Sequence, residues 1–225
     1  MITQNKNSLS IASLIFNSVS LFTISICSNL SFNFKFGHII VNHNGIPFSD
    51  QDVTSITSIG YSSPDKSKNI KKTGYKGIGF KAVFIVSDKV VIASGGYTFE
   101  FSKYHRFHKD TKWGIENIPW EIQPIWLQKY RLPYWAPKYM PLTKESTSFL
   151  LELKNNREIT PEKVEIDANK IFKNPRFSLF LRNTTKISLE GRNGKLSIEK
   201  SFNHEDSTIK LLLNNGKHHT NWNFR

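Results

Sequence analysis

The spacing of apolar residues changes along the first part of the chain. Apolar side chains between Leu9 and Val19 recur at helical spacing, which predicts a helix. From Leu30 to Phe36 every second residue is apolar and the residues between are polar, so we expect a half-buried strand. The segment "HIIVN" continues as a second strand and stops at "HNG", which is typical of a turn.

A capped helix follows this turn. Ser49 and Asp52 have the spacing of a capping box, and Phe48 and Val53 stand where a hydrophobic staple would enclose it. We therefore expect a helix over about Asp50 to Ile59.

The next segment is polar and leads to a cluster of glycines. Residues 60–76 are too rich in Ser, Lys and Gly for a core element, which indicates a mobile loop or lid. Beyond the glycines, "FKAVFIVS" predicts a short helix. The segments "KVVIAS" and "YTFEF" predict a hairpin around the turn Gly95–Gly96.

Residues 103–142 form an irregular insertion in which prolines alternate with Trp and Tyr residues. We expect this insertion to pack as a cover over an edge of the core, with Trp126 buried. A surface that stacks bases or binds peptides is the alternative interpretation.

The last third returns to regular elements. The segment "STSFLLELK" predicts a strand, and a helix is expected over Pro161 to Phe172 with the proline in its first turn. Four further strands are predicted by "FSLFLRN", "TKISLEG", "KLSIEKSF" and "TIKLLLNN". This order indicates an α/β protein with a boundary near residues 155–175. A first domain would span 1–155, and 156–225 would begin a further α/β segment of a larger protein.

The charge of the chain favours anionic partners. Lys and Arg total 31 against 18 Asp and Glu, which gives a net charge of +13. Such a surface attracts nucleotides, nucleic acid or an anionic membrane face, but it is equally typical of a basic surface that only aids solubility.

The number of cysteines and the hydropathy of the chain indicate its cellular compartment. Cys27 is the single cysteine, so the chain cannot form an internal disulfide or a cysteine-rich zinc site. The uncharged segment between Lys6 and Lys35 is interrupted by Ser and Asn, which argues against a membrane span and a signal peptide. We expect an intracellular protein, cytoplasmic or nuclear, without membrane association. Its oligomeric state stays open.

The glycine segment "GYKGIGFK" suggests a phosphate site. It lacks the Lys-Ser/Thr pair of a Walker A loop, and its order G-x-x-G-x-G differs from a dinucleotide fingerprint. Backbone amides at a helix start, with lysines nearby, can nevertheless hold phosphate. A loop that simply turns into a packed helix is the alternative.

The order of motifs resembles a known family. "HNGIPFSDQDVTSITSIG" followed by "GYKGIGFKAVFIVSD" is similar to the Bergerat-fold ATP-binding domain shared by gyrase B, heat-shock chaperones, histidine kinases and MutL, and most closely to its sacsin and NO VEIN branch. "FSLFLRNTTKISL" also resembles that branch, and the similarity covers about residues 9–213. It implies a two-layer α/β sandwich with a mixed, mainly antiparallel sheet and helices on one face. A C-terminal β-rich extension would follow, and the lid at about 60–76 would close over a triphosphate.

The resemblance assigns roles to individual residues. Asn17 falls where the family binds magnesium beside the phosphates of ATP. His43 and Gly45 fall on the family's Asp-x-Gly, whose aspartate accepts from the adenine amino group. Gly77 and Gly79 match glycines whose amides approach the phosphates.

Two more positions complete the expected ATP site. Lys81 adjoins the glycines, where its ammonium could reach phosphate as a point charge. Thr147, in "STSF", matches the hydroxyl residue of the family's last motif. At His43 the chain departs from the family, because a neutral imidazole accepts only through one ring nitrogen.

The catalytic base of the family is missing. Ser13 stands where the family has a Glu that activates water, and a serine hydroxyl cannot act as a general base without a base of its own. We therefore expect a sacsin-like, chaperone-like module that binds Mg-ATP with weak or absent hydrolysis. Whether the chain is an enzyme stays open. The alternative is a non-enzymatic module for nucleic acid or a client protein that keeps the fold without nucleotide.

Overall fold

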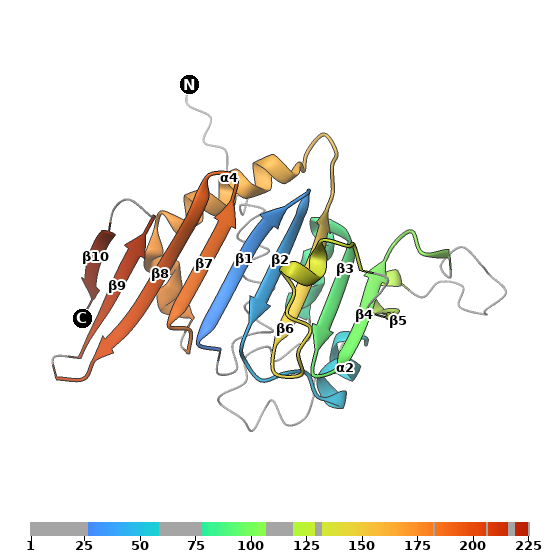
Figure 1. Ribbon diagram of the computed structural model, residues 1–225, viewed down its shortest axis with the longest axis horizontal. Coiled ribbons are helices and arrows are strands. Elements are labelled where there is room, and N and C mark those ends of the chain that lie inside the picture. Colours follow the sequence, from blue (N-terminus) through green and yellow to red (C-terminus); the bar gives the residue numbers. More distant parts are fainter. Residues whose placement is uncertain are drawn as a thin grey trace.

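The computed structural model describes residues 27–58, 78–106, 119–128, 132–181, 183–205, 207–215 and 219–224. Within these residues ten strands form one open mixed sheet in the order β10-β9-β8-β7-β1-β2-β6-β3-β4-β5 (Figure 1). The neighbours are antiparallel except β1 and β7, which are parallel. The chain is therefore a mixed α/β protein rich in β-structure, as the sequence predicts.

The central strands form where the sequence predicts them. β1 (Asn29–Lys35) and β2 (His38–His43) are joined by a tight turn in which Phe36 and Gly37 both have positive φ. Two such residues match the right-handed twist of a hairpin. β3 (Ser87–Ser94) and β4 (Tyr97–Ser102) form the predicted hairpin around Gly95–Gly96, and β6 (Thr147–Leu153) lies between β2 and β3.

The C-terminal strands extend the same sheet. They are β7 (Lys186–Gly191), β8 (Gly194–Asn203), β9 (Thr208–Asn214) and β10 (His219–Phe224). Because β7 pairs with β1, the strands on the two sides of the predicted boundary at residue 155 belong to one sheet. β10 was not anticipated from the sequence.

Two helices begin where the capping residues predict them. α2 (Asp50–Ile56) starts at Ser49, whose side chain caps the helix while Asp52 completes the capping box. It ends three residues before the predicted Ile59. α4 spans Pro161–Phe172 as predicted, with Thr160 as its N-cap.

The helix after the glycines is short. α3 (Ile78–Lys81) tightens at once into the 3₁₀ helix η2 (Ala82–Ile85).

One predicted strand is wrong. The segment "FSLF" belongs to the 3₁₀ helix η8 (Pro175–Phe180), which Asn174 caps. Pro175 at its first turn has a fixed φ and no N–H group for a strand ladder. Phe177 of η8 packs against Phe172 of α4, with 5.4 Å between ring centroids, so contact with α4 outweighs the alternating pattern.

The two faces of the sheet carry different cores. Inward residues of the central strands, such as Val41, Ile92 and Phe149, form one large cluster with apolar residues of α2, α3, η2 and α4. On the other face Ile40, Val91 and Leu150 form a smaller cluster with residues of the 132–142 segment. The helices and this segment therefore contribute to clusters on different faces.

The insertion confirms its expected role only in part. Its described elements are η5 (Trp120–Ile122), β5 (Ile125–Trp126) and η7 (Ala136–Lys138). Leu132, Ala136 and Met140 are buried against the sheet, so this segment is a cover. Trp126 is 57% exposed, which corrects the expectation that it is buried. It lies over Phe99 on the edge of the sheet, where little covers it.

Several sequence predictions fall outside the described residues. These are the helix at 9–19 with Ser13 and Asn17, the lid at 60–76, and Gly77.

Candidate functional site

Three neighbouring strands end at a common polar level. In the register of the sheet His43 of β2 is opposite Thr147 of β6, and Thr147 is opposite Ser94 of β3. Directly opposed residues in antiparallel strands project from the same face. Their alternation with Val41, Phe149 and Ile92 places all three on the face that carries the helix-bearing cluster. The sheet thus joins His43 and Thr147, which come from different motifs of the sequence.

Thr147 belongs to a buried hydroxyl pair. Its Oγ1 lies 2.5 Å from Ser94 Oγ, which also accepts from the backbone N–H of Phe48 at 2.9 Å. Thr147 and Ser94 are almost completely buried. The two hydroxyl groups have one hydrogen each, and the hydrogen bond between them uses only one of these. The other O–H can therefore donate to a further acceptor. Ser94 was missed from sequence because nothing local to "KVVIAS" reveals its register with Thr147.

His43 is buried and neutral. Only 4% of the residue is exposed, and its ring stacks on Phe149 with 6.3 Å between centroids. Nδ1 accepts a hydrogen bond from the backbone N–H of Gly45 at 3.0 Å. Burial lowers the pKa of the imidazole from 6.5 to about 4, because the charged form is poorly solvated inside the protein.

The second ring nitrogen of His43, Nε2, is a buried hydrogen-bond donor. In a neutral imidazole whose Nδ1 accepts, Nε2 carries the proton and is a donor. Nε2 is buried, and it has no hydrogen-bond partner in the part of the chain that the structure describes. A buried donor without an acceptor costs free energy, so such a group calls for an explanation.

The loop that follows His43 is held in place. Asn44 accepts from the N–H of Asn29 at 2.8 Å and donates to Ser28 Oγ at 2.8 Å. Cys27 lies beneath this loop and donates to the carbonyl of Asn29. Burial raises the pKa of the Cys27 thiol to about 11, so it stays protonated and has a structural role. Gly45 is thereby presented to Nδ1 of His43.

Only part of the glycine segment lies among the described residues. Gly79 lies in α3, whereas Gly77 is outside the described residues. With four residues before it tightens, α3 has too few aligned peptide units for a strong dipole. A phosphate would therefore depend on individual backbone amides.

The side chain of Lys81 is already hydrogen-bonded within the protein. Its ammonium donates to the carbonyl of Ile56, at the end of α2, at 2.7 Å, and to that of Glu121, in η5, at 2.6 Å. It also lies 5.3 Å from the ring centroid of Phe101. Burial lowers the pKa of Lys81 to about 8, and Glu121 opposes this shift. A phosphate contact would use the remaining N–H group or require Lys81 to leave a carbonyl.

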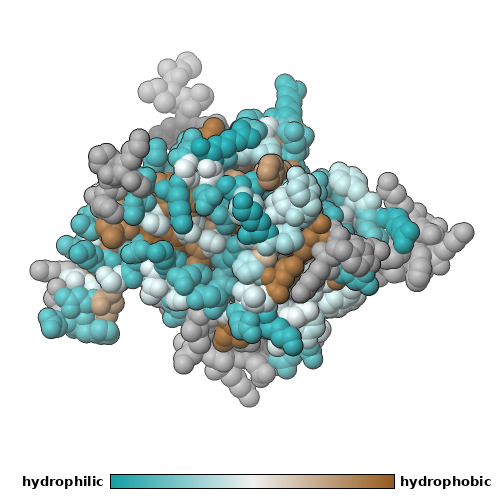
Figure 2. All heavy atoms as spheres, viewed as in Figure 1, coloured by the Kyte–Doolittle hydropathy of each residue, from teal (hydrophilic) through white to brown (hydrophobic). Residues whose placement is uncertain are grey.

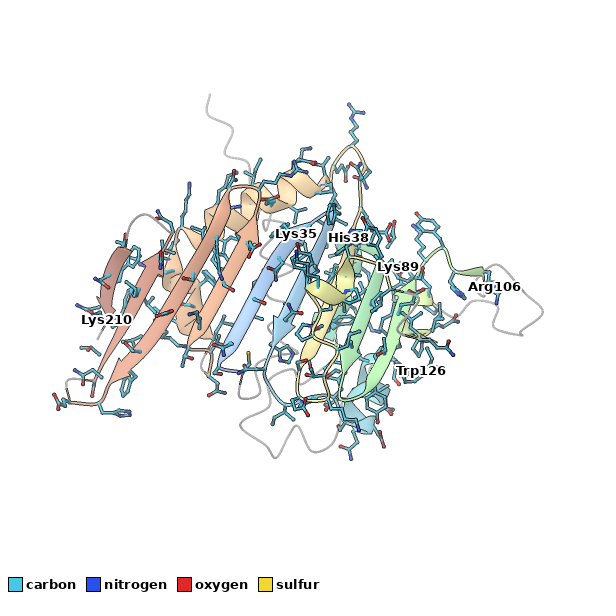
Figure 3. The ribbon with its side chains drawn as sticks, in the orientation of Figure 1. Lys35, His38, Lys89, Arg106, Trp126 and Lys210 are labelled. Carbon is cyan, nitrogen blue, oxygen red and sulfur yellow. The ribbon has the colours of Figure 1, made fainter. Side chains whose placement is uncertain are left out.

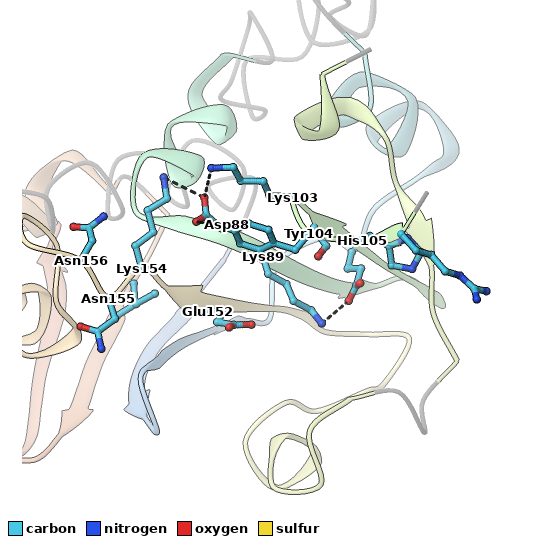
Figure 4. Close-up of a pocket in the computed structure, with 13 residues that line it drawn as sticks. Asp88, Lys89, Lys103, Tyr104, His105, Glu152, Lys154, Asn155 and Asn156 are labelled. Atoms are coloured by element: carbon cyan, nitrogen blue, oxygen red, sulfur yellow. Dashed lines mark hydrogen bonds and ion pairs between the residues drawn. The ribbon is translucent and has the colours of Figure 1, made fainter. Parts of the chain in front are cut away.

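A separate groove lies at the opposite ends of β3, β4 and β6 (Figure 4). It encloses about 940 Å³ and carries charges of both signs. Asp88 pairs with Lys154 at 3.3 Å and with Lys103 at 3.8 Å, and Lys89 pairs with Glu100 at 3.1 Å. Because these cations already have carboxylate partners, the groove is a weaker candidate than the His43 site.

Magnesium was expected at Asn17, beside the phosphates. The described ranges hold no group of three or more His, Cys, Asp or Glu that could bind a metal. The predicted ligand Asn17 is outside those ranges.

Comparison with known proteins does not assign the chain to a family. No family model matches it, and no curated protein matches it. In the described part of the chain, no helix is long and apolar enough to cross a membrane.

Proposed function

We propose that this chain is a nucleotide-binding module of the Bergerat type, similar to the sacsin and NO VEIN branch. It binds a nucleoside triphosphate with magnesium on the helix-bearing face of its sheet, and the resemblance implies ATP. The observation that carries the proposal is the juxtaposition of His43 and Thr147 on adjacent strands. These residues come from two distant motifs that the resemblance assigns to one site, and the register brings them to one level of one face.

The distribution of the core supports this fold. A two-layer sandwich requires helices that pack on one face of the sheet. Apolar residues of α2, α3 and α4 share one cluster with inward residues of β1, β2, β3, β4 and β6. In Figure 1, α2 and α4 lie behind the sheet, whereas η7 lies in front of it.

Phosphate contact is assigned to the glycine segment. Gly79 directly precedes Phe80 in α3, and the ring centroid of the buried Phe80 lies 6.0 Å from that of Phe149. Phe149 also stacks on His43. Phe149 therefore contacts both the residue that follows the glycines, Phe80, and the proposed base-binding residue, His43.

A titration of thermal stability tests nucleotide binding. A ligand at about 100 times its Kd stabilises the native state by about 3 kcal/mol, which raises Tm by about 5–10 °C for a chain of this size. We expect this increase with the magnesium complexes of ATP or GTP and of a non-hydrolysable analogue.

Two glycine variants serve as a matched pair in that titration. Gly79→Val should abolish the increase, because a β-branched side chain stands where amides must approach phosphate. Gly194→Ala should lower the starting Tm, because Gly194 has a positive φ that alanine adopts only with strain, but it should keep the increase on adding nucleotide, since Gly194 begins β8 and its new Cβ would meet nothing within 4 Å. Equal affinity in a folded Gly79→Val protein would refute the phosphate assignment.

Hydrolysis is expected to be near background. Ser13 replaces the family's catalytic Glu, and a general base is typically worth about 10²–10⁴-fold in rate. If Asn17 holds magnesium, Ser13→Glu places a carboxylate one helical turn away and should raise turnover. Robust magnesium-dependent hydrolysis by the unmodified chain would contradict this assignment.

The alternative, a nucleic-acid-binding module, is favoured by the opposite face of the sheet. Figure 2 shows that this face is mostly hydrophilic, and Figure 3 shows Lys35 beside His38 on it. Lys138 lies 5.7 Å from the ring centroid of Tyr139, Lys35 lies 5.4 Å from it and pairs with Glu190 at 3.0 Å, and Phe36 is 70% exposed. Cations among accessible rings suit single-stranded nucleic acid. Polynucleotide binding that weakens steeply with salt, without protection by nucleotide, would favour this alternative.

A further inference from the structure

The hydrogen-bond polarity of His43 determines which base the site can accept. The backbone N–H of Gly45 occupies Nδ1 at 3.0 Å, so the proton of the neutral ring is on Nε2. Rotating the ring by 180° would turn a carbon toward that N–H and leave Gly45 without its acceptor. The contact with Gly45 therefore sets both the orientation of the ring and its tautomer.

On the helix-bearing face at this end of the sheet, the unpaired side-chain atoms of the described residues are donors. His43 Nε2–H is buried and lacks an acceptor among the described residues. The Thr147–Ser94 hydroxyl pair next to it retains one O–H hydrogen after its internal bond and the N–H of Phe48 are counted. A ligand that pairs with these groups must present acceptors.

Purine bases differ in this respect at position 6. Adenine carries an amino group, which is a donor, whereas guanine carries the acceptor O6. An adenine amino group facing Nε2–H would oppose donor to donor, and both hydrogens would stay unpaired. A 6-oxo group would give the buried Nε2–H its missing partner.

We propose that the site selects purines with a 6-oxo group, such as guanine and hypoxanthine, over adenine, with His43 Nε2 donating to O6. This inference rests on the proposed function, because it assumes that a nucleotide occupies this end of the sheet. It replaces the ATP that the family resemblance implies. His43 is then the specificity-determining residue, and Gly45 is a positioning residue that acts through the ring.

Affinities of the full chain for four magnesium nucleotides test the proposal. Calorimetric titration with GTP, ITP, ATP and UTP should show GTP and ITP binding about 5- to 150-fold tighter than ATP, since the cost of one unpaired buried donor corresponds to a factor in this range. ITP separates the 6-oxo group from the 2-amino group of guanine. UTP tests whether a purine is required, because uracil also presents a carbonyl acceptor, O4.

The unmodified protein decides the matter without any variant. ATP binding as tightly as GTP, ITP binding no more tightly than ATP, or UTP binding as tightly as GTP would each overturn the selection of 6-oxo purines and leave nucleotide binding intact. If none of the four binds, the proposed function itself is overturned.

A reversal experiment assigns the selectivity to one residue. His43→Asp replaces the donor by an acceptor, which should reverse the preference to ATP. His38→Asp is the matched control, because it makes the same change at the other end of β2 and should leave the preference for GTP unchanged. A folded His43→Asp protein that still prefers GTP would overturn the role of His43.

Discussion

The buried imidazole of His43 should make the protein sensitive to mild acid. Its pKa lies at about 4 in the native state against an ordinary value of 6.5. Below 6.5 the unfolded chain binds a proton that the native state refuses, so stability is complete above 6.5 and falls as pH decreases toward 4. Protonation would also place an N–H on Nδ1, opposite the N–H of Gly45.

The size of the loss follows from these two pKa values. Each pH unit between them corresponds to about 1.4 kcal/mol. The protein should therefore lose about 2 kcal/mol between pH 7 and pH 5, and about 3 kcal/mol by pH 4, through this residue alone. That is a large share of the 5–15 kcal/mol that typically stabilises a native protein.

Urea denaturation of the wild-type protein and of His43→Asn isolates this contribution. The asparagine carbonyl can accept from the N–H of Gly45 as in an Asx turn, while it does not titrate. Other groups titrate in both proteins, so their effects cancel in the difference between the two stability curves. We expect the curves to diverge by about 2 kcal/mol between pH 7 and pH 5. Parallel curves, or a His43 NMR resonance that titrates near pH 6.5, would refute the reasoning.

Three stability predictions address the surroundings of the site. Gly95→Ala should destabilise the protein more than Gly96→Ala in thermal melts, because both glycines have positive φ but only at Gly95 would a Cβ lie 2.6 Å from a backbone carbonyl oxygen. Equal losses would contradict this account. Phe80→Ala should cost about 3–5 kcal/mol in urea denaturation, since Phe80 is fully buried, whereas Ile85→Ala, at a half-exposed position, should cost much less. Ser49→Ala should cost about 0.5–2 kcal/mol through the lost cap of α2, and an unchanged urea midpoint would argue against the capping box.

Local signals predicted the elements that they control. The capping box of Ser49 and Asp52 and the start of α4 at Pro161 depend on residues a few positions apart, and the structure has both where they were expected. Alternation likewise predicted β1, and the turn Gly95–Gly96 between two strand-forming segments predicted β3 and β4. Where local signals competed, as in "FSLF", the packing of Phe177 against Phe172 decided for a helix.

The composition of the aromatic insertion did not predict which of its tryptophans are exposed. Trp126 and Trp135 stand in similar surroundings of proline and aromatic residues. Trp126 lies on the edge strand β5, where it is 57% exposed, whereas Trp135 packs against the cluster around Met140. The difference arises from how each segment meets the sheet, which no neighbouring residue specifies.

By itself the sequence determined the class of the fold, the positions of its main strands and helices, and the residue types available to the site, because propensity, capping and alternation act over a few residues. Only the tertiary structure decided that His43, Thr147 and Ser94 share one level of one face, since strand register is set by contacts between distant segments. It also decided the chemistry of His43. The N–H of Gly45 determines which ring nitrogen carries the proton, and burial keeps the ring neutral.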